Sequence, residues 1–366
     1  MILPPVYPLK ADQFQSASNR SFESKTDGEM NIVVFTKNWI GDVIFETPAI
    51  RAIKENFPTA CLIAITPKRC VEILEVNPYI DEVISFDEKE GDRSIFSKLK
   101  LILGLRKRRI DKAFLFHRSS TRARIAWLAG VRERVGYDVK GAAFLTHAVP
   151  EPEGSLHDVQ YFMDLIQAVG LKVNGEYAYE FYFQEKDKAR AEILLREHRF
   201  DPKRLIAINP GANWPPKRWP AEYFRELAHR LIDRCGVQVV LTGDHNDQPV
   251  AEIVLNSHRH PNLVSVCGKT TVRELGALFS MCRLVISNDT GPLHIASGVG
   301  TNVVGIFGPT APLGTAPLGR GRNIIIQYAP DSVKLPWIGK KFPSPWMELI
   351  TVDEVFDAIE REKLLP

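Results

Sequence analysis

The stretch Val285–Gly300, VISNDTGPLHIASGVG, decides the fold of this chain. It begins as a short apolar run that predicts a buried strand, continues as a polar turn and ends as a helix opened by Pro292. Where a strand leads through such a turn into a helix, free backbone amides and the positive end of the helix dipole point at one place. The turn therefore predicts an anion site at Asp289, Thr290 and Gly291, with phosphate as the expected ligand. The other interpretation is a plain connection in which Asp289 or Thr290 caps the helix.

The bulk composition predicts a cytoplasmic protein of two domains. The 366 residues exceed the typical ~100–200 residues of one domain, and the net charge of +3 implies no field for nucleic acid or another polyanion. The five cysteines lie far apart without CxxC or metal-ligand spacing, which is typical of thiols in a reducing compartment. No apolar run approaches the ~20 residues that span a bilayer. The start, MILPPVYPLK, lacks the features of a secretory signal.

Alternating strand and helix patterns predict an α/β fold of two doubly wound, Rossmann-like domains. Strands are expected at 31–36, 61–66, 82–86 and 112–116, and again at 205–209, 237–242, 263–267, 284–287, 303–307 and 323–327. Helical spacing lies between them, as over 43–57, 95–107 and 221–235. Such alternation predicts parallel sheets covered by helices on both faces.

The expected organisation is a loosely ordered extension over 1–29, a first domain over 30–175, a second over 176–350 and a closing helix over 351–366. Two domains of this kind leave a cleft at the carboxyl ends of their strands, where ligands bind in open parallel sheets. The loops that follow strands are therefore expected to carry the chemistry.

The loop after the first strand, NWIGD (38–42), holds two candidate residues. Gly41 lets the backbone turn tightly and lets a ligand come close. Asp42 begins a helix and is either its N-cap or a general base that takes a proton from an alcohol. The loop is not GxGxxG, and the chain has no dinucleotide fingerprint elsewhere, which argues against a dehydrogenase.

Two loops of the second half carry charges suited to a nucleotide. In NPGANWPPKRWP (209–220), Lys217 and Arg218 form a cation pair beside a helix start, which suits a diphosphate or a solvated basic turn. In LTGDHND (241–247), Asp244 ends a strand, where an acidic residue accepts from both ribose hydroxyls or simply forms a turn. His294 lies one turn into the helix after the DTG turn, where its apolar setting fits either packing or contact with a ligand.

Positive charge gathers in two segments of the first half. HRSSTRAR (117–124) follows a predicted strand, so His117, Arg118 and Arg122 predict a basic wall for an acidic acceptor. LRKRR (105–109) is interpreted as a solvated helix end. Neither an interleaved aromatic surface nor a global basic excess supports nucleic acid as the partner.

In their order along residues 30–362, these motifs resemble glycosyltransferase family 9, the ADP-heptose:lipopolysaccharide heptosyltransferases. The resemblance rests on WIGDVIFETPAIRAIKENFP (39–58), the NPGA…KRWP loop, the TGD loop and SNDTGPLHIASGVGTNVVGIFGPT (287–310). The W-x-G-D form and the KRWP loop are most similar to the branch that adds the second core heptose. MELITVDEVFDAI (347–359) is similar to the closing segment of the family.

The resemblance implies a GT-B fold whose second domain holds most of the donor, and an inverting transfer that needs no metal. On the matching positions it implies that Asp42 is the catalytic base and that Lys217 contacts the donor phosphates. It implies that Asp244 contacts the ribose, and that the DTG turn (289–291) holds the diphosphate and the sugar.

The expected reaction moves a heptose from ADP-heptose to an anionic glycolipid, the inner core of lipopolysaccharide, with no cofactor, metal or nucleic acid. Such an enzyme is expected in the cytoplasm, with at most peripheral contact at the inner face of the inner membrane. The sequence leaves two alternatives open. One is a GT-B transferase that uses another nucleotide sugar for another surface glycan, and the other is a nucleotide-binding relative without turnover.

Overall fold

The computed structural model describes residues 30–152, 156–256, 260–328 and 345–365. The chain divides into two compact units, residues 1–153 with 161–176 and residues 154–160 with 177–366. The extension expected over 1–29 lies outside the described residues.

The first unit is built on a six-stranded parallel sheet with strand order β3-β2-β1-β4-β5-β6. Its strands are β1 (Asn31–Phe35), β2 (Cys61–Thr66), β3 (Glu82–Ser85), β4 (Lys112–Leu115), β5 (Glu133–Tyr137) and β6 (His147–Val149). The central strand β1 is a continuous apolar run and is buried along its whole length, as expected of a strand covered on both faces.

Helices join these strands on both faces of the sheet. They are α1 (Ile40–Phe45), α2 (Thr47–Asn56), α3 (Val71–Leu74), α4 (Ile95–Lys107), α5 (Ser120–Leu128) and α6 (Asp158–Ala168). The single helix predicted over 43–57 is wrong, because the chain forms α1 and α2 with a break at Glu46. Pro48 has no amide hydrogen for a continuous helix, so it lies in the first turn of α2 instead.

The second unit repeats this plan with strand order β12-β11-β10-β7-β8-β9, again parallel throughout. Its strands are β7 (Leu205–Asn209), β8 (Gln238–Leu241), β9 (Leu263–Ser265), β10 (Leu284–Asn288), β11 (Asn302–Phe307) and β12 (Asn323–Gln327). Its helices are α7 (Glu185–Glu197), α8 (Ala221–Cys235), α9 (Gln248–Leu255), α10 (Val272–Ser280), α11 (Gly291–Gly298), α12 (Pro312–Thr315), α13 (Pro345–Glu348) and α14 (Val352–Arg361).

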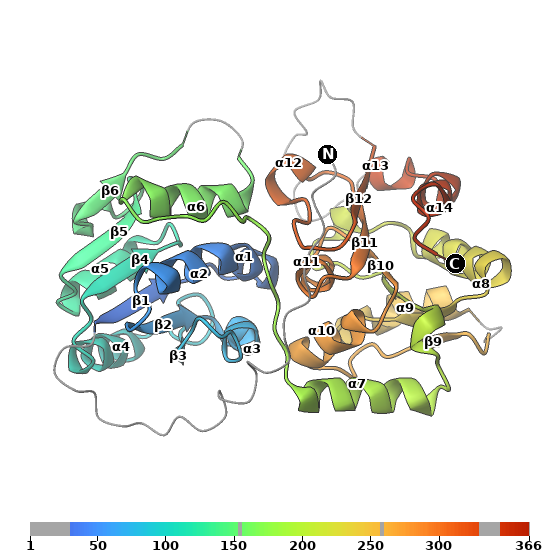
Figure 1. Cartoon of the computed structure of the whole chain (residues 1–366), viewed down its shortest axis with the longest axis horizontal. Helices are drawn as coiled ribbons and strands as arrows, with labels where there is room; N and C mark the ends of the chain where they lie inside the picture. The colour runs from blue at the N-terminus through green and yellow to red at the C-terminus, as the bar shows by residue number, and fades with distance from the viewer. Residues whose placement is uncertain (1–29, 153–155, 257–259, 329–344, 366) are drawn as a thin grey trace. The chain divides into compact units, whose positions relative to one another are not determined.

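Each unit has its own apolar core between sheet and helices (Figure 1). In the first unit, alternate residues of β1 and β2 such as Val33 and Ile63 pack against α4 and α5. In the second unit, α8 and α14 cover β7 through contacts that include Ile206 and Phe356. Among the described helices, none is long and apolar enough to cross a membrane.

The predicted α/β class with two doubly wound parallel sheets is confirmed. The sequence did not predict β5 or β6. The segment of β5 begins with the charged pair Glu133 and Arg134, and β6 has three residues at an edge of the sheet. Neither therefore forms the apolar run by which the other strands were predicted.

In both sheets the strand order reverses in the middle. The reversal lies between β1 and β4 in the first unit and between β7 and β10 in the second. Loops at such a point lead to opposite faces of the sheet, and ligands of open α/β sheets bind outside the strand ends there. The loops after these four strands are NWIGD, HRSSTRAR, NPGANWPPKRWP and the DTG turn.

Candidate functional site

The DTG turn of the second unit is built around the carboxylate of Asp289. Asp289 directly follows β10 and is 3% exposed. Its Oδ2 accepts hydrogen bonds from Lys217 Nζ at 2.6 Å and from Thr310 Oγ1 at 2.7 Å. These two partners come from the loops after β7 and β11, the strands on either side of β10. Adjacent strand ends thus bring together three residues that are far apart in the sequence.

His294 and Tyr179 form a second layer behind Asp289. His294 is 3% exposed, with Nε2 3.7 Å from Asp289 Oδ1 and Nδ1 3.2 Å from the Tyr179 hydroxyl oxygen. Burial alone would raise the pKa of Asp289, but the hydrogen bond with His294 and the charge of Lys217 outweigh it and lower the pKa well below its usual range. Asp289 is therefore ionised at neutral pH, and its contact with Lys217 is a largely buried ion pair.

Asn288 and Trp219 fix the loop that carries Lys217. Asn288 Nδ2 donates to two carbonyl oxygens at the start of this loop, at 3.0 and 3.1 Å, and its Oδ1 accepts the Trp219 amide hydrogen at 3.0 Å. The Trp219 ring is buried and donates its Nε1–H to the carbonyl oxygen of Ile350 at 2.9 Å. Because both ends of the loop are tied down, Lys217 has little freedom to leave the DTG turn.

Arg218 and Asp244 are exposed residues of the same sheet edge. Arg218 Nε donates to the carbonyl oxygen of Ala212 at 2.8 Å, within its own loop. Asp244 follows β8 and caps a short 3₁₀ turn, His245–Asp247, with Oδ1 accepting the Asn246 amide hydrogen at 2.6 Å. Asp244 therefore forms a turn, as one of the two interpretations predicts. Its contact with a ribose stays a prediction.

Asp247 fills the space between the Lys217 loop and the Asp244 turn. Its carboxylate accepts the Asp244 amide hydrogen at 3.0 Å, and burial raises its pKa. A β-carbon on Gly211 would lie 2.0 Å from Asp247 Oδ1, and one on Gly243 would lie 2.7 Å from Oδ2. A side chain at either glycine would therefore force the Asp247 carboxylate to shift.

Thr290 and Gly291 begin α11, as the sequence predicts. Thr290 is the N-cap residue, but its side chain makes no capping hydrogen bond and instead donates to the carbonyl oxygen of Asn288 at 3.3 Å. Asp289 holds Lys217 and does not cap the helix. Of the two N-caps considered for this turn, Thr290 is therefore confirmed by position and Asp289 is wrong. The site for an anion at the start of α11 stays a prediction.

In the first unit, Asp42 lies in the first turn of α1. The N-cap residue of this helix is Trp39, so the interpretation of Asp42 as the N-cap is wrong. Gly41 precedes it as the second helical residue, and both are partly exposed. The role of Asp42 as a general base stays a prediction.

Glu46 lies one helical turn after Asp42 and is fully buried. Its Oε1 accepts the Lys37 amide hydrogen at 2.7 Å, and its Oε2 has no hydrogen-bond partner among the described residues. Burial raises the pKa of Glu46 well above its usual range; the amide and charge of Lys37 oppose this shift, and the charge of Asp42 adds to it. Glu46 therefore keeps its proton at a pH where an ordinary carboxyl group has lost it.

Arg122 is a fully buried cation beneath the loop after β1. Its guanidinium donates to the carbonyl oxygen of Thr36 and, at 2.6 Å, to Asn38 Oδ1. Asn38 Nδ2 in turn donates to His117 Nε2 at 2.8 Å. Burial, with the charge of Arg122, lowers the pKa of His117 to about 3, so the ring is neutral. The expectation that Arg122 presents its charge to an acceptor needs revision, because this side chain is out of reach of solvent and supports the loop.

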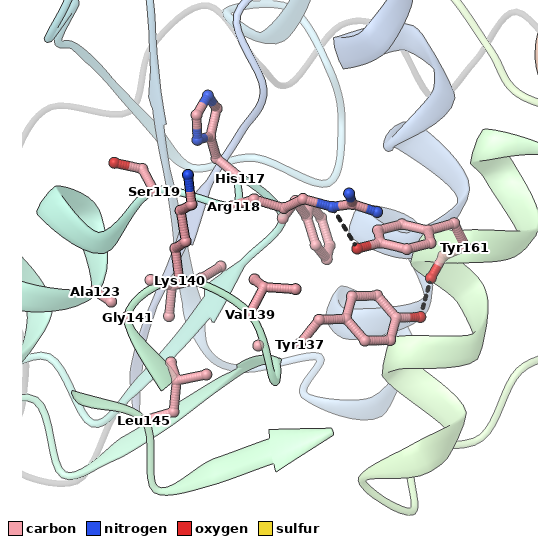
Figure 2. A pocket seen from close by; sticks show the side chains of 13 residues that line it. His117, Arg118, Ser119, Ala123, Tyr137, Val139, Lys140, Gly141, Leu145 and Tyr161 are labelled. Carbon is pink, nitrogen blue, oxygen red and sulfur yellow. Dashed lines mark hydrogen bonds between the residues drawn. The ribbon is translucent and has the colours of Figure 1, made fainter. Parts of the chain in front are cut away.

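Arg118 lines a small hollow within the first unit, beside the ends of β4 and β5 (Figure 2). Its Nε donates to the Tyr161 hydroxyl oxygen at 3.0 Å, and its guanidinium pairs with Glu151. Figure 2 shows the side chains of Ser119 and Lys140 lining the same hollow. In the basic wall expected here, Arg118 is thus paired with the carboxylate of Glu151. Lys140 adds a cation that was not predicted from the sequence.

Sequence reasoning gave no role to three residues: Thr310, which binds Asp289, Asn288, which holds the Lys217 loop, and Glu46, which binds the Lys37 amide. Thr310 ends the GIFGPT segment, whose Gly-Pro turn follows the strand next to β10, and Asn288 directly precedes DTG, so both could have been found from their sequence positions. No sequence pattern around Glu46 indicates its burial. Within the parts of the chain that the structure describes, no three His, Cys, Asp or Glu side chains gather into a set that could hold a metal ion.

Comparison with known proteins identifies the family. The profile of glycosyltransferase family 9 (heptosyltransferase) matches residues 98–335, more than half of the chain. The chain belongs to glycosyltransferase family 9. This family 9 protein is therefore a glycosyltransferase, and the matched segment includes the HRSSTRAR loop, the KRWP loop and the DTG turn.

Relatives of this family 9 protein agree in sequence and in fold. Lipopolysaccharide heptosyltransferase 2 of Escherichia coli (strain K12) is 26% identical over 306 residues, which cover 81% of this chain and 88% of that protein. The solved structure of E. coli ADP-heptose lps heptosyltransferase II has a TM-score of 0.74 at 24% identity and covers 92% of this chain and 98% of its own. A glycosyl transferase family 9 structure from Veillonella parvula has a TM-score of 0.82 at 24% identity, with 92% and 97% covered. These structures show that the fold is that of GT-B heptosyltransferases.

Proposed function

We propose that this family 9 protein transfers a heptose from ADP-heptose to a sugar of the lipopolysaccharide inner core, with inversion at the sugar C1 and without a metal. The observation that carries the proposal is the buried Lys217–Asp289 pair where the strand order of the second sheet reverses. A fixed cation beside the first amides of a helix suits the two phosphates of a nucleoside diphosphate. The names of the E. coli relative and of the similar E. coli structure support heptose as the sugar and ADP-heptose as the donor.

The donor diphosphate is proposed to lie against Lys217 and the amides of Thr290 and Gly291. An ammonium group has three donor hydrogens, and one of those on Lys217 is used by Asp289. Asp289 and His294 are buried, so their proposed role is to position Lys217 and not to contact the sugar.

The rest of the nucleotide is assigned to the two exposed residues of the same edge. Arg218 is proposed to turn from its own loop toward the second phosphate, since among the described residues its guanidinium group makes one hydrogen bond, to the carbonyl oxygen of Ala212. Asp244 is proposed to accept from the ribose hydroxyls while its backbone stays held by Asp247.

The acceptor is proposed to be an anionic glycolipid bound by the first unit. Asp42 is the proposed general base, and Gly41 lets the acceptor hydroxyl come close to it. Arg118, whose side chain is 56% exposed, is proposed to bind an acceptor anion in competition with Glu151. His117 and Arg122 are proposed to support this site by holding the loop of Asp42 through Asn38.

The proposed reaction is a single displacement. Asp42 takes the proton of the acceptor hydroxyl while its oxygen forms a bond to the sugar C1 on the face opposite the diphosphate. The bond between C1 and the phosphate oxygen breaks, and its electron pair leaves with ADP. Lys217 and the amides of the DTG turn stabilise the charge that develops on the leaving diphosphate. Attack from the opposite face inverts the configuration of the sugar.

The protein is proposed to work in the cytoplasm, with peripheral contact at the inner face of the inner membrane. A lipid-anchored acceptor is held at that surface, whereas a nucleotide sugar diffuses in water. Contact at the surface would bring the two substrates together.

A donor panel followed by a transfer assay tests the proposed function. We expect ADP to raise the melting temperature more than GDP or UDP, and ADP-heptose to be consumed with an inner-core lipopolysaccharide acceptor in the presence of EDTA. A larger shift with GDP or UDP would favour a transferase of another nucleotide sugar. A shift with ADP but no donor consumption would favour a nucleotide-binding relative without turnover, and loss of transfer in EDTA would contradict metal independence.

A further inference from the structure

Helix α4 of the first unit exposes an apolar face that the proposed reaction does not use. Ile95 is 80% exposed, Phe96 84%, Leu99 48% and Leu103 54%. Three of them recur every fourth residue and so form one line along the helix. The opposite side of α4 is apolar as well and packs on the sheet. A helix that is apolar on both sides is typical of one covered by a second apolar layer.

The end of α5 lies beside α4 and adds to this surface. Trp127 is 50% exposed and Leu128 is 37% exposed. Arg106 Nε of α4 donates to the carbonyl oxygen of Leu128 at 2.9 Å, which ties the two helix ends together. We call the exposed side chains of the two helices the α4–α5 patch, which consists of Ile95, Phe96, Leu99, Leu103, Trp127 and Leu128.

Basic residues of α4 accompany the patch, whereas the acidic residues Asp87, Glu88, Glu90 and Asp92 precede the helix and Arg108 at its end pairs with Glu82. The segment 93–110, RSIFSKLKLILGLRKRRI, has seven Lys or Arg residues and no Asp or Glu. Lys100, Arg106 and Lys107 are exposed. Among the described residues, no carboxylate is recorded within 4 Å of Lys98, Lys100 or Lys107. In LRKRR (105–109), interpreted from sequence as a solvated helix end, Arg106 and Lys107 are exposed beside the patch, Leu105 is buried and Arg108 pairs with Glu82.

We infer that the α4–α5 patch docks the first unit on an anionic lipid bilayer surface. Apolar side chains on a helix with flanking Lys and Arg insert at the boundary of headgroups and acyl chains, while the cations meet anionic headgroups. A second copy of the chain fits this surface poorly, because a symmetric dimer would place the same basic segment against itself. The charge therefore favours a bilayer over self-association.

The topology places the start of the α4–α5 patch at the sheet edge that carries the proposed acceptor site, whereas Trp127 and Leu128 at the end of α5 lie at the opposite edge. Helix α4 follows β3 and leads to β4, so Ile95 and Phe96 at its start lie at the carboxyl edge of the first sheet. The loops of Asp42 and His117 lie at that same edge. Only this consequence rests on the proposed function: docking would hold the acceptor site near the sugars of a membrane-anchored glycolipid.

Flotation of the purified full-length protein with vesicles tests the inference without donor or acceptor present, so it can fail while the proposed function stands. We expect binding to vesicles of phosphatidylglycerol and phosphatidylethanolamine, weaker binding at high salt, and little binding to phosphatidylcholine alone. The double variant Ile95→Ser, Phe96→Ser should bind the anionic vesicles at least about tenfold more weakly, because two apolar side chains are removed from the acyl boundary. Lys100→Glu with Lys107→Glu should lose about tenfold or more.

A matched control separates the patch from a general effect of surface changes. Ile193 on α7 is 46% exposed and lies on a helix of mixed charge, so Ile193→Ser should bind vesicles like the wild type. The inference is overturned if the wild type binds phosphatidylcholine and anionic vesicles equally, or if the double variant binds like the wild type. It is also overturned if light scattering shows a dimer that the double variant converts to a monomer.

Discussion

The carboxylate of Asp289 is a buried charge around which the DTG turn of the second unit is built. A buried carboxylate is tolerated only when charged or hydrogen-bonding partners surround it. Lys217, Thr310 and His294 supply these partners. The contacts that stabilise the carboxylate also hold the Lys217 ammonium in one place, so folding and the proposed donor binding depend on the same ion pair.

Lys217→Ala should weaken ADP binding and lower stability together. Loss of a hydrogen bond to a charged group costs about 1.5–3 kcal/mol, roughly ten- to hundredfold in affinity. Asp289 would also lose its cation, which should lower the free energy of unfolding by about 1–3 kcal/mol. Isothermal titration calorimetry with ADP and urea unfolding measure the two effects.

The double variant Lys217→Ala, Asp289→Asn is the matched control. It removes the charge of the carboxylate as well as its partner, so it should recover part of the lost stability but none of the ADP affinity. An unchanged dissociation constant for ADP in Lys217→Ala would remove this residue from the site.

Glu46→Gln should change the pH dependence of stability. Because the pKa of Glu46 is raised in the folded protein, the folded state holds a proton that the unfolded state releases above its ordinary pKa near 4.5. The stability of the wild type therefore falls as pH rises above that value, and this loss is absent in the variant.

Urea unfolding of both proteins from pH 5 to 8 measures this effect. The difference in unfolding free energy should shift in favour of Glu46→Gln with rising pH, by up to about 1.4 kcal/mol per pH unit. A difference that is constant over this range would show that Glu46 is ionised in the folded protein.

At the residue scale, the sequence predicted which side chains belong to the site better than it predicted the contacts between them. Asp42, Lys217 and Asp289 were singled out because each follows a predicted strand. The contact of Lys217 with Asp289 could not be predicted, since it depends on which strands are neighbours. Arg122 follows a strand as predicted, but the prediction that its side chain is exposed was wrong. A cation buried beneath a loop has the same local sequence pattern as one on a surface.

Among the elements, the NPGANWPPKRWP loop is held by close packing with the turn after β8. Gly211→Ala should push the Asp247 carboxylate away, because the added methyl group would lie 2.0 Å from its Oδ1. Such overpacking should cost about 1–3 kcal/mol of stability, measured by urea unfolding. It should also weaken ADP binding, since Asp247 holds the backbone of Asp244.

Gly211→Ala in an Asp247→Ala background tests whether contact with the Asp247 carboxylate causes the loss of stability. There the methyl group has room, so Gly211→Ala should cost much less than in the wild type, as expected for residues in direct contact. Equal costs in the two backgrounds would show that the damage arises elsewhere in the loop.

Element boundaries could be predicted wherever an apolar pattern or a cap marked them. The closing helix expected from residue 351 is α14, which begins at Val352 behind a capping box of Thr351 and Glu354. The break between α1 and α2 was missed because the apolar spacing continues across it. Pro48 indicates such a break, since proline is favoured only in the first turn of a helix. For α4 the pattern gave the helix but not its exposure, since apolar residues occur on both of its sides.

At the scale of the whole molecule, two sheets with the same strand order organise the site residues. Alternating strands and helices predict parallel sheets with right-handed crossovers, but they do not fix the order of the strands. The observed reversals put two of the predicted loops side by side in each unit. The sequence could therefore predict which loops matter, whereas the topology supplies their pairing.

The central claim is that Asp42 of the first unit acts on the acceptor while the second unit holds ADP-heptose. The most direct test is the variant Asp42→Asn, with turnover and the dissociation constant of ADP-heptose measured on the same preparation. We predict that turnover falls roughly 10²–10⁴-fold, because the proton acceptor is lost, while the dissociation constant stays at the wild-type value. Turnover close to that of the wild type would contradict the account.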